Sequence, residues 1–247
     1  MRAMPASLLA PALSPAALRR LKALVWLLAL LPLARLVWLG AHDGFGANPL
    51  EFVTRSTGTW ALVLLCVTLA ITPLRHWSGA HWLVRLRRLL GLFAFFYACL
   101  HMLLWFVVDQ GLDPSAMLAD VIKRPFITAG FTAFALMAIL AVTSPHAVVR
   151  RLGGRRWQML HRLVYVVAVL AILHYWWHKA GKNDFGEVTI YAAVVAVLLG
   201  ARMVRAWRRR MQTAKPAGKA QDGAGDSTGG EAVRMMPADR GTSSSDA

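Results

Sequence analysis

LLGLFAFFYACLHMLLWFVV (Leu89–Val108) and WQMLHRLVYVVAVLAILHYWW (Trp157–Trp177) are the two stretches that decide the fold class of this chain. Each is predominantly apolar and close to the roughly 20 residues that a helix needs to cross a bilayer. Each also carries histidine, and an imidazole is costly to leave unpaired in hydrocarbon, so it marks a candidate functional site. The two stretches therefore predict membrane-spanning helices with functional histidines.

Four more apolar stretches of similar length raise the number of predicted spans to six. Of the 247 residues, 57% are hydrophobic, which is too apolar for a soluble domain, while the chain is too short for several membrane domains. We therefore predict an all-α integral membrane protein, a six-helix bundle that occupies residues 21–206. The predicted spans are Leu21–Leu39, Thr57–Leu74, Leu89–Val108, Phe126–Thr143, Trp157–Trp177 and Val188–Ala206.

The basic residues behind the formal net charge of +16 are distributed as the predicted topology requires, so no nucleic-acid partner is expected. Arginines and lysines concentrate before the first span, after the last span and in the second and fourth loops. By the positive-inside rule these segments are cytoplasmic, which places both termini inside. The acidic residues outside the C-terminal tail fall in the other three loops, which then face outward: Asp43, Glu51, Asp109, Asp113, Asp120, Asp184 and Glu187.

Both ends of the chain are predicted to lie outside the membrane. Residues 1–20 contain three prolines and lack a clear cleavage site, so we expect a cytoplasmic segment followed by a first span that is retained as an anchor. Residues 207–247 are basic at first and then rich in Gly, Ser, Ala and Asp. Because such a composition buries too little apolar surface to fold, we predict a disordered cytoplasmic tail.

Three histidines lie inside the predicted spans, and their depths separate them. At 1.5 Å per residue from the cytoplasmic ends of their helices, His101 lies about 18 Å deep, His174 about 25 Å and His161 about 6 Å. Neutral imidazole is a common ligand of haem iron. His101 and His174 are closest in depth, and modest helix tilt absorbs the mismatch. We therefore predict that they hold a haem between the third and fifth spans, nearer the outer face.

His161 precedes His174 by 13 residues, close to the spacing with which membrane cytochromes hold two haems on one helix. At about 100° per residue, however, the two side chains point about 140° apart. Either the helix deforms or His161 faces another partner, and a second haem needs a further ligand such as His76 or His146. The sequence leaves the number of haems at one or two.

The presence or absence of other motifs limits which cofactors and reactions can be expected. Cys66 and Cys99 lie in different spans, so no disulfide is expected, and without a C-x-x-C-H motif any haem is held non-covalently. No dinucleotide fingerprint, phosphate loop or catalytic triad pattern is present, so no catalytic residue is predicted and electrons must come from a separate donor. Five arginines are most simply topological but can also pair with a propionate or a flavin phosphate: Arg87, Arg88, Arg155, Arg156 and Arg162.

Four segments carry a family resemblance: RRLLGLFAFFYACLH (Arg87–His101), TSPHAVVRRLGGRRWQMLHRLVYVVAVLAILHYWW (Thr143–Trp177), GANPLE (Gly46–Glu51) and ITPL (Ile71–Leu74). They resemble the MsrQ (YedZ) family, the haem-binding membrane subunits of the MsrPQ protein-methionine-sulfoxide reductase system. The resemblance covers about Leu21 to Arg205 and leaves out the tail.

The resemblance implies a ferric-reductase-like transmembrane domain in the bacterial inner membrane, with b-type haem and FMN, whose haem-iron ligands are His101, His161 and His174. It implies an electron-transfer subunit of an oxidoreductase rather than the catalytic subunit. Electrons then pass from the quinone pool or a cytosolic flavin reductase to MsrP, a periplasmic molybdopterin protein that reduces methionine sulfoxide in oxidised periplasmic proteins.

Two alternative functions stay open at this point. One is a stand-alone ferric or cupric reductase, which would need no partner protein as the electron acceptor. The other is a haem-free transporter or scaffold, in which the membrane histidines serve a proton path or helix packing. An optical spectrum of the purified protein separates the haem-binding functions from the haem-free one.

Overall fold

The computed structural model describes residues 13–181 and 183–213. The predicted tail from Ala214 onward and most of the predicted N-terminal segment lie outside the described residues, within which every regular element is helical. In chain order these elements are α1 (Pro15–Ala41), α2 (Pro49–Ser78), the 3₁₀ turn η2 (His81–Leu83), α3 (Val84–Leu104), the π-helical turn η3 (Trp105–Asp109), α4 (Pro114–Lys123), α5 (Pro125–Val142), α6 (His146–Leu152), α7 (Gly154–Leu160), α8 (Leu163–Ala180) and α9 (Gly186–Thr213).

Within the described residues, six helical segments are long and apolar enough to cross a membrane, which confirms the predicted six-span, all-α fold. Cys66 and Cys99 are both free, as expected. The second span begins at Pro49, well before the predicted start at Thr57. The short helices α4 and α6 lie between spans and were not predicted.

The start of α2 explains why the second span is longer than predicted. The Asn48 side chain caps the helix by accepting a hydrogen bond from the Glu51 amide at 3.1 Å, and Pro49 occupies the first turn. Proline has no N–H to leave unpaired there, and an acidic side chain suits the positive end of the helix dipole. The GANPLE segment thereby sets the helical register of Thr54 and Gly58, which lie in the first turns of α2.

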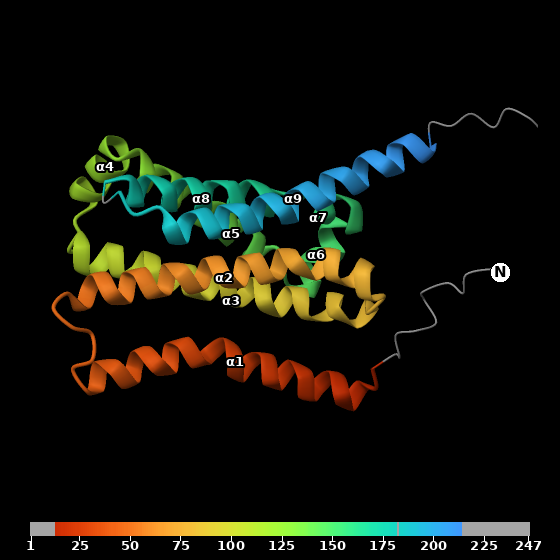
Figure 1. Cartoon of the computed structure of the whole chain (residues 1–247), viewed down its shortest axis with the longest axis horizontal. Helices are drawn as coiled ribbons and strands as arrows, with labels where there is room; N and C mark the ends of the chain where they lie inside the picture. The colour runs from red at the N-terminus through yellow and green to blue at the C-terminus, as the bar shows by residue number, and fades with distance from the viewer. Residues whose placement is uncertain (1–12, 182, 214–247) are drawn as a thin grey trace, which may run out of the picture. The chain divides into compact units, whose positions relative to one another are not determined.

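Two antiparallel helix pairs, α2 with α3 and α5 with α8, make the most extensive contacts, and α3 also packs on α5. Figure 1 shows these helices running alongside one another. The side chains that pack between them are almost completely buried, among them Leu69, Ala94, Tyr97, Val167 and Ala168. These four helices therefore form the scaffold on which any site between them is built.

A buried tyrosine ties α1 to this scaffold. The Tyr97 hydroxyl donates to the Ala29 carbonyl at 2.7 Å and accepts from the Leu33 amide at 3.2 Å. Pro32 lies inside α1 next to these groups, and proline opens the helical hydrogen-bond ladder. The hydroxyl bridges two backbone groups that are paired in a regular helix, so α1 is joined to α3 by polar bonds as well as by packing.

The fifth span is not one continuous helix. Helix α7 ends at Leu160, His161 and Arg162 form a turn, and α8 begins at Leu163. The break changes the direction in which the side chain of His161 points relative to those of α8. This break is the helix deformation that the sequence offered as one of two ways to reconcile the directions of the His161 and His174 side chains.

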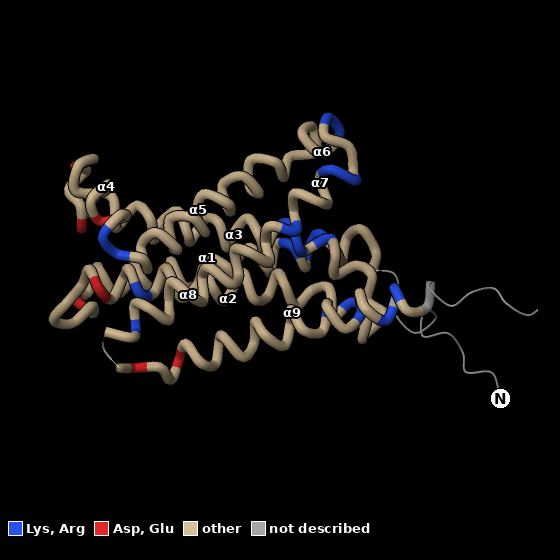
Figure 2. Tube along the Cα trace, turned by 90° about the horizontal axis from the view of Figure 1, so that it is seen from above, with Lys and Arg blue, Asp and Glu red and all other residues tan. Residues whose placement is uncertain are grey.

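Charged residues divide between the two ends of the bundle (Figure 2). The chain consists of two units, Met1–Ala206 and Trp207–Ala247, and this division of charge concerns the first. The described carboxylates gather at one end, named here the carboxylate end: Asp43, Glu51, Asp109, Asp113, Asp120, Asp184 and Glu187. Most described arginines of the first unit gather at the opposite end, named here the arginine end.

Candidate functional site

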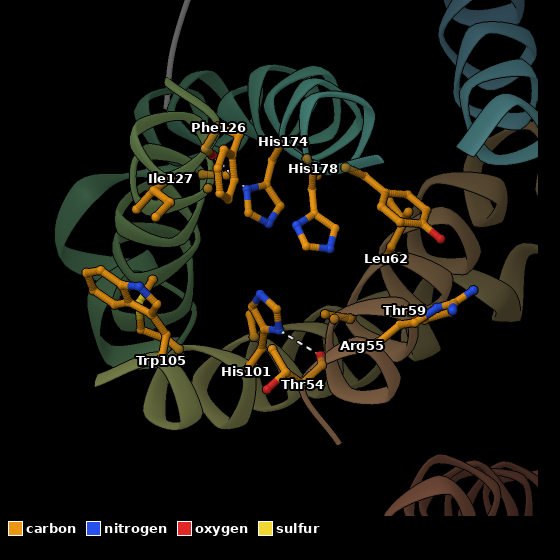
Figure 3. Close-up of a pocket in the computed structure, with 18 of the residues that line it drawn as sticks. Thr54, Arg55, Thr59, Leu62, His101, Trp105, Phe126, Ile127, His174 and His178 are labelled. Carbon is orange, nitrogen blue, oxygen red and sulfur yellow. Dashed lines mark hydrogen bonds between the residues drawn. The ribbon is translucent and has the colours of Figure 1, made fainter. Parts of the chain in front are cut away.

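Two of the three membrane histidines face each other across a cavity of about 550 Å³ toward the carboxylate end. Figure 3 shows the ring of His101 from α3 and the ring of His174 from α8 pointing into it from opposite sides, with His178 nearby. The centroids of the first two rings are 6.1 Å apart and their planes make an angle of 83°. The two histidines that are closest in predicted depth are thus the two that the fold brings together.

Each of these rings is oriented by a hydrogen bond to a backbone carbonyl of the neighbouring helix. His101 Nδ1 lies 2.9 Å from the Thr54 oxygen in α2, and His174 Nδ1 lies 2.7 Å from the Phe126 oxygen in α5. A carbonyl oxygen only accepts, so each Nδ1 must carry the hydrogen and donate it. The neutral ring then keeps its lone pair on Nε2, which is the arrangement that metal-ligating histidines use.

A glycine makes room for each ring against the helix that it contacts. Gly58 and Gly130 each stand four residues after the acceptor carbonyl, and a side chain there would lean back over that carbonyl. A Cβ at Gly58 would lie 3.1 Å from His101 Nδ1, and one at Gly130 would lie 2.6 Å from His174 Nδ1. The glycines therefore allow the imidazoles to approach the backbone closely enough to bond to it.

The two half-sites repeat the same layout. In each helix pair the first helix supplies the carbonyl and the glycine, and the second supplies the histidine. The carbonyl precedes its histidine by 47 residues in the α2–α3 pair and by 48 in the α5–α8 pair. The two pairs share this geometry with little residue identity around it.

This arrangement fits a metal held by two axial imidazoles. Bonds from an imidazole nitrogen to a metal are about 2 Å long, so two opposed bonds span about 4 Å. The distance from each nitrogen to its ring centre accounts for the rest of the observed 6.1 Å. Among the described residues, no group of three or more His, Cys, Asp or Glu could hold a bare ion. A metal bound between the two rings would take its other ligands from a cofactor, as the macrocycle of haem supplies them.

Cationic side chains line the mouth of the cavity, and each is paired with a carboxylate. Lys179 is only 3% exposed, and a buried ammonium is tolerated only with such a partner. Its hydrogen bond and its charge hold the pKa of the Asp184 carboxyl below the usual value. Such cations can also bind carboxylates of a ligand. The pairs are Arg55 with Glu187 at 2.8 Å, Arg124 with Asp120 at 2.9 Å, and Lys179 with Asp184.

His161 does not line this cavity. Its Nδ1 donates to the Trp157 carbonyl at 3.2 Å, and its ring lies against the Trp157 indole with centroids 4.0 Å apart. The charge of Arg87 acts on the ring, which places His161 toward the arginine end. The helix thus deforms at His161, which is one of the two alternatives that the sequence left open, and the partner of His161 in a second haem site stays a prediction.

The five predicted arginines also lie apart from the histidine pair, and none of them lines the cavity. Arg87 is half-buried, whereas the other four are exposed: Arg88, Arg155, Arg156 and Arg162. Exposed arginines at a membrane boundary are ordinary contacts for water and lipid headgroups. The structure thus distinguishes Arg87 from the rest of the predicted set.

Sequence analysis missed most of the groups that hold the rings. The predicted site residues did not include Thr54, Phe126, Gly58, Gly130 or Lys179. A usable signal was present, because Gly58 precedes its histidine by 43 residues and Gly130 precedes its own by 44. The acceptor carbonyls carry no side-chain signal, since any residue supplies one.

The chain matches a known membrane family over most of the two helix pairs. The ferric reductase like transmembrane component family matches residues 57–172. The match begins one residue before Gly58 and ends two residues before His174, so it covers most of the scaffold around the cavity.

Several relatives match over nearly their whole length. The protein-methionine-sulfoxide reductase heme-binding subunit MsrQ of Ralstonia nicotianae is 66% identical over 206 residues, which are 83% of this chain and 95% of that protein. The protein of the same name from Bordetella parapertussis is 60% identical over 80% of this chain and 96% of its own length. The one from Herminiimonas arsenicoxydans is 56% identical over 83% of this chain and 94% of its own length.

Proposed function

We propose, since this chain belongs to the MsrQ family of haem-binding subunits of protein-methionine-sulfoxide reductase, that His101 and His174 are the axial ligands of a b-type haem that carries electrons across the bacterial inner membrane. The observation that supports this most directly is the opposed pair of rings 6.1 Å apart. Both rings have their Nδ1 hydrogens committed to carbonyls, so both Nε2 lone pairs are available to iron.

The residues around the pair orient the ligands and tune their basicity. Haem supplies the one-electron chemistry when bound. The carbonyls of Thr54 and Phe126 hold each imidazole in one tautomer, and accepting its hydrogen makes the ring a stronger electron donor. The cations at the cavity mouth, Arg55, Arg124 and Lys179, can bind the haem carboxylates. Apolar side chains from the four helices line much of the rest of the cavity.

The charge at the two ends supports an orientation in the membrane, and this orientation gives the side on which the donor and the acceptor would each meet the protein. By the positive-inside rule the arginine end is cytoplasmic and the carboxylate end is periplasmic. We expect the periplasmic acceptor to be MsrP, docking on α4 and on the segment before α9, at residues 109–125 and 179–187. The donor at the opposite end is quinol or a cytosolic flavin reductase, with FMN bound there. His161 belongs to that end, and one haem suffices for the histidine pair at the other.

The optical spectrum of the purified protein tests the ligand assignment. We expect the reduced-minus-oxidised bands of a low-spin b cytochrome in the native protein, and their loss in His101→Ala and in His174→Ala, because either change removes one axial imidazole. His161→Ala is the matched control and should keep the low-spin bands. Intact bands in His174→Ala together with lost bands in His161→Ala would assign the iron to His161 instead. A complete absence of a Soret band in the native protein would favour the haem-free alternative.

The electron path needs a reconstituted system. Vesicles that contain the protein are supplied with quinol, or with a flavin reductase and its reductant, and reduction of MsrP outside the vesicles is followed. Reduction of MsrP that requires the haem-loaded chain supports the proposal. Full reduction of added ferric or cupric ions with no transfer to MsrP would favour the stand-alone metal reductase, which the match to the ferric reductase family keeps as the second candidate.

A further inference from the structure

A second cavity, of about 390 Å³, lies beside the histidine cavity and is lined by side chains from α1, α2 and α9. Arg55 and Thr59 of α2 border both cavities, whereas the other residues that line the second cavity belong to it alone. Helix α1 runs along the edge of the bundle (Figure 1) and packs mainly on α3. The second cavity therefore lies where α1 has little direct packing against α2 and α9.

Two arginines line the second cavity at the same depth. Arg35 stands six residues before the end of α1 at Ala41, and Arg55 stands six residues after the start of α2 at Pro49. At 1.5 Å per residue, both lie about 9 Å from the ends of their helices. Long basic side chains at such positions extend to the boundary between hydrocarbon and headgroups. Both guanidinium groups can therefore meet one headgroup at this boundary.

The charges that line the second cavity do not cancel. Arg55 is paired with the Glu187 carboxylate at 2.8 Å, and that carboxylate also accepts from the Tyr175 hydroxyl at 2.7 Å. Among the described residues Arg35 makes no ion pair, and its guanidinium lies over the Phe52 ring, 5.8 Å from the centroid. A charge within a membrane span is costly unless it is paired. One negative charge from outside the chain therefore balances this cavity.

An exposed apolar stripe begins at the second cavity on each of α1 and α9. The stripe of α1 runs back from Arg35 in steps of three or four residues, and that of α9 runs forward from Ile190 in the same steps. This spacing places each stripe on one face of its helix. The exposed members are Leu24, Leu28 and Leu31 in α1 and Ile190, Val194 and Val197 in α9. Both stripes lead from the cavity toward the middle of the membrane and suit acyl chains.

We propose that the second cavity binds the headgroup of an anionic phospholipid from the leaflet at the carboxylate end. The phosphate supplies the one negative charge that balances Arg35, and guanidinium N–H donors match phosphate oxygens. The hydroxyls of Ser56, Thr59 and Tyr191 also line the cavity and can bond to the glycerol of the headgroup. The acyl chains lie along the two stripes. The lipid then joins α1 to α2 and α9, which direct helix packing does not do.

Lipid retention tests the proposal. The full-length, haem-loaded protein is taken from vesicles of equal parts phosphatidylglycerol and phosphatidylcholine and analysed by native mass spectrometry. We expect phosphatidylglycerol to be retained about 10-fold more than phosphatidylcholine, as charge-assisted hydrogen bonds to the phosphate of a lipid with net negative charge imply. Arg35→Gln should remove this preference, and Arg35→Lys should keep most of it. Arg20→Gln makes the same charge change at an exposed position near the other end of α1, so it is the matched control and should keep the preference.

Ser56→Leu separates the cavity from the charge. Ser56 lines the second cavity but not the histidine cavity, and the larger side chain fills space while every charge stays in place. We expect the preference for phosphatidylglycerol to be lost here too. A native preference in Arg35→Gln or in Ser56→Leu contradicts the proposal, and so does an equal loss in Arg20→Gln, which would indicate general attraction of anionic lipid to a basic chain. Low-spin haem bands show that each variant is folded and should persist in all of them.

Discussion

In the α2–α3 pair, His101 bonds to a carbonyl that also accepts from the Thr57 hydroxyl at 3.0 Å, whereas in the α5–α8 pair His174 makes a shorter bond, 2.7 Å, to its carbonyl. The space around the two glycines also shows that the α5–α8 half is packed more tightly. A Cβ at Gly58 would lie 3.1 Å from the facing ring, and one at Gly130 would lie 2.6 Å from it. Two half-sites with one layout therefore differ in packing, and the α5–α8 half has less room to adjust.

Gly130→Ala tests the more tightly packed α5–α8 half-site and should have the largest effect on haem binding. Because a Cβ cannot stand 2.6 Å from His174 Nδ1, the ring must move and lose its bond to the Phe126 carbonyl. We expect haem affinity to fall by about 10- to 100-fold, the range for losing a group that orients a metal ligand. Haem content after purification and the low-spin bands measure this.

The control for Gly130→Ala is Gly91→Ala in α3. Its Cβ would meet only the Thr68 methyl carbon at an ordinary 3.7 Å. Replacing glycine by alanine inside a helix is itself favourable by about 0.5–1 kcal/mol, so the control should keep its haem and lose no stability. Equal haem loss in both variants would mean that helix packing in general, and not the histidine contact, determines haem binding.

Gly58→Ala should have the intermediate effect. The Cβ would lie 3.1 Å from His101, a distance that a shift of a few tenths of an ångström relieves. We expect a haem affinity loss of less than about 10-fold, below the range for losing an orienting group, with low-spin bands that are retained but displaced. Titration of the haem-depleted protein with haem compares it directly with Gly130→Ala. A larger loss here than in Gly130→Ala would reverse the order of the two half-sites.

Thr57→Val should have the smallest effect. Thr57 is buried and its hydroxyl donates only to the Val53 and Thr54 carbonyls. Without it the Thr54 oxygen accepts more strongly from His101, so the imidazole becomes more basic and stabilises ferric iron. We expect full haem content and a small negative shift of the midpoint potential in a spectroelectrochemical titration. A positive shift would show that the Thr57 hydroxyl does not compete with His101 for that carbonyl.

Hydrophobic run length and charge alternation were enough to predict the six spans and their division of charge. Both signals are local, since a helix of about 20 apolar residues spans a bilayer whatever it packs against. The start of α2 was predicted too late because Asn48 and Pro49 cap a helix outside the apolar run. The break at His161 was left open because periodicity assumes a continuous helix.

The candidate site, like the fold, could be predicted only in part from the sequence. Depth counting brought His101 and His174 together because the rise per residue is constant in a helix. It could not find the Thr54 and Phe126 carbonyls, since backbone acceptors leave no mark on the sequence. The position of Arg202 was equally hidden, because it lies 133 residues from Leu69 in sequence and only the packing of α9 near α2 brings its guanidinium to the Leu69 carbonyl.

The amino-acid sequence alone determined the number of spans, the division of charge between the two faces and the depth of each histidine, because these depend on residue order along single helices. Only the tertiary structure decided which histidine rings face each other, which nitrogen each presents and which arginines lack an acidic partner. These are properties of pairs of helices. They depend on the rotation of each helix about its own axis, and Gly58 and Gly130 permit the close approach of the histidine rings that the observed rotations require.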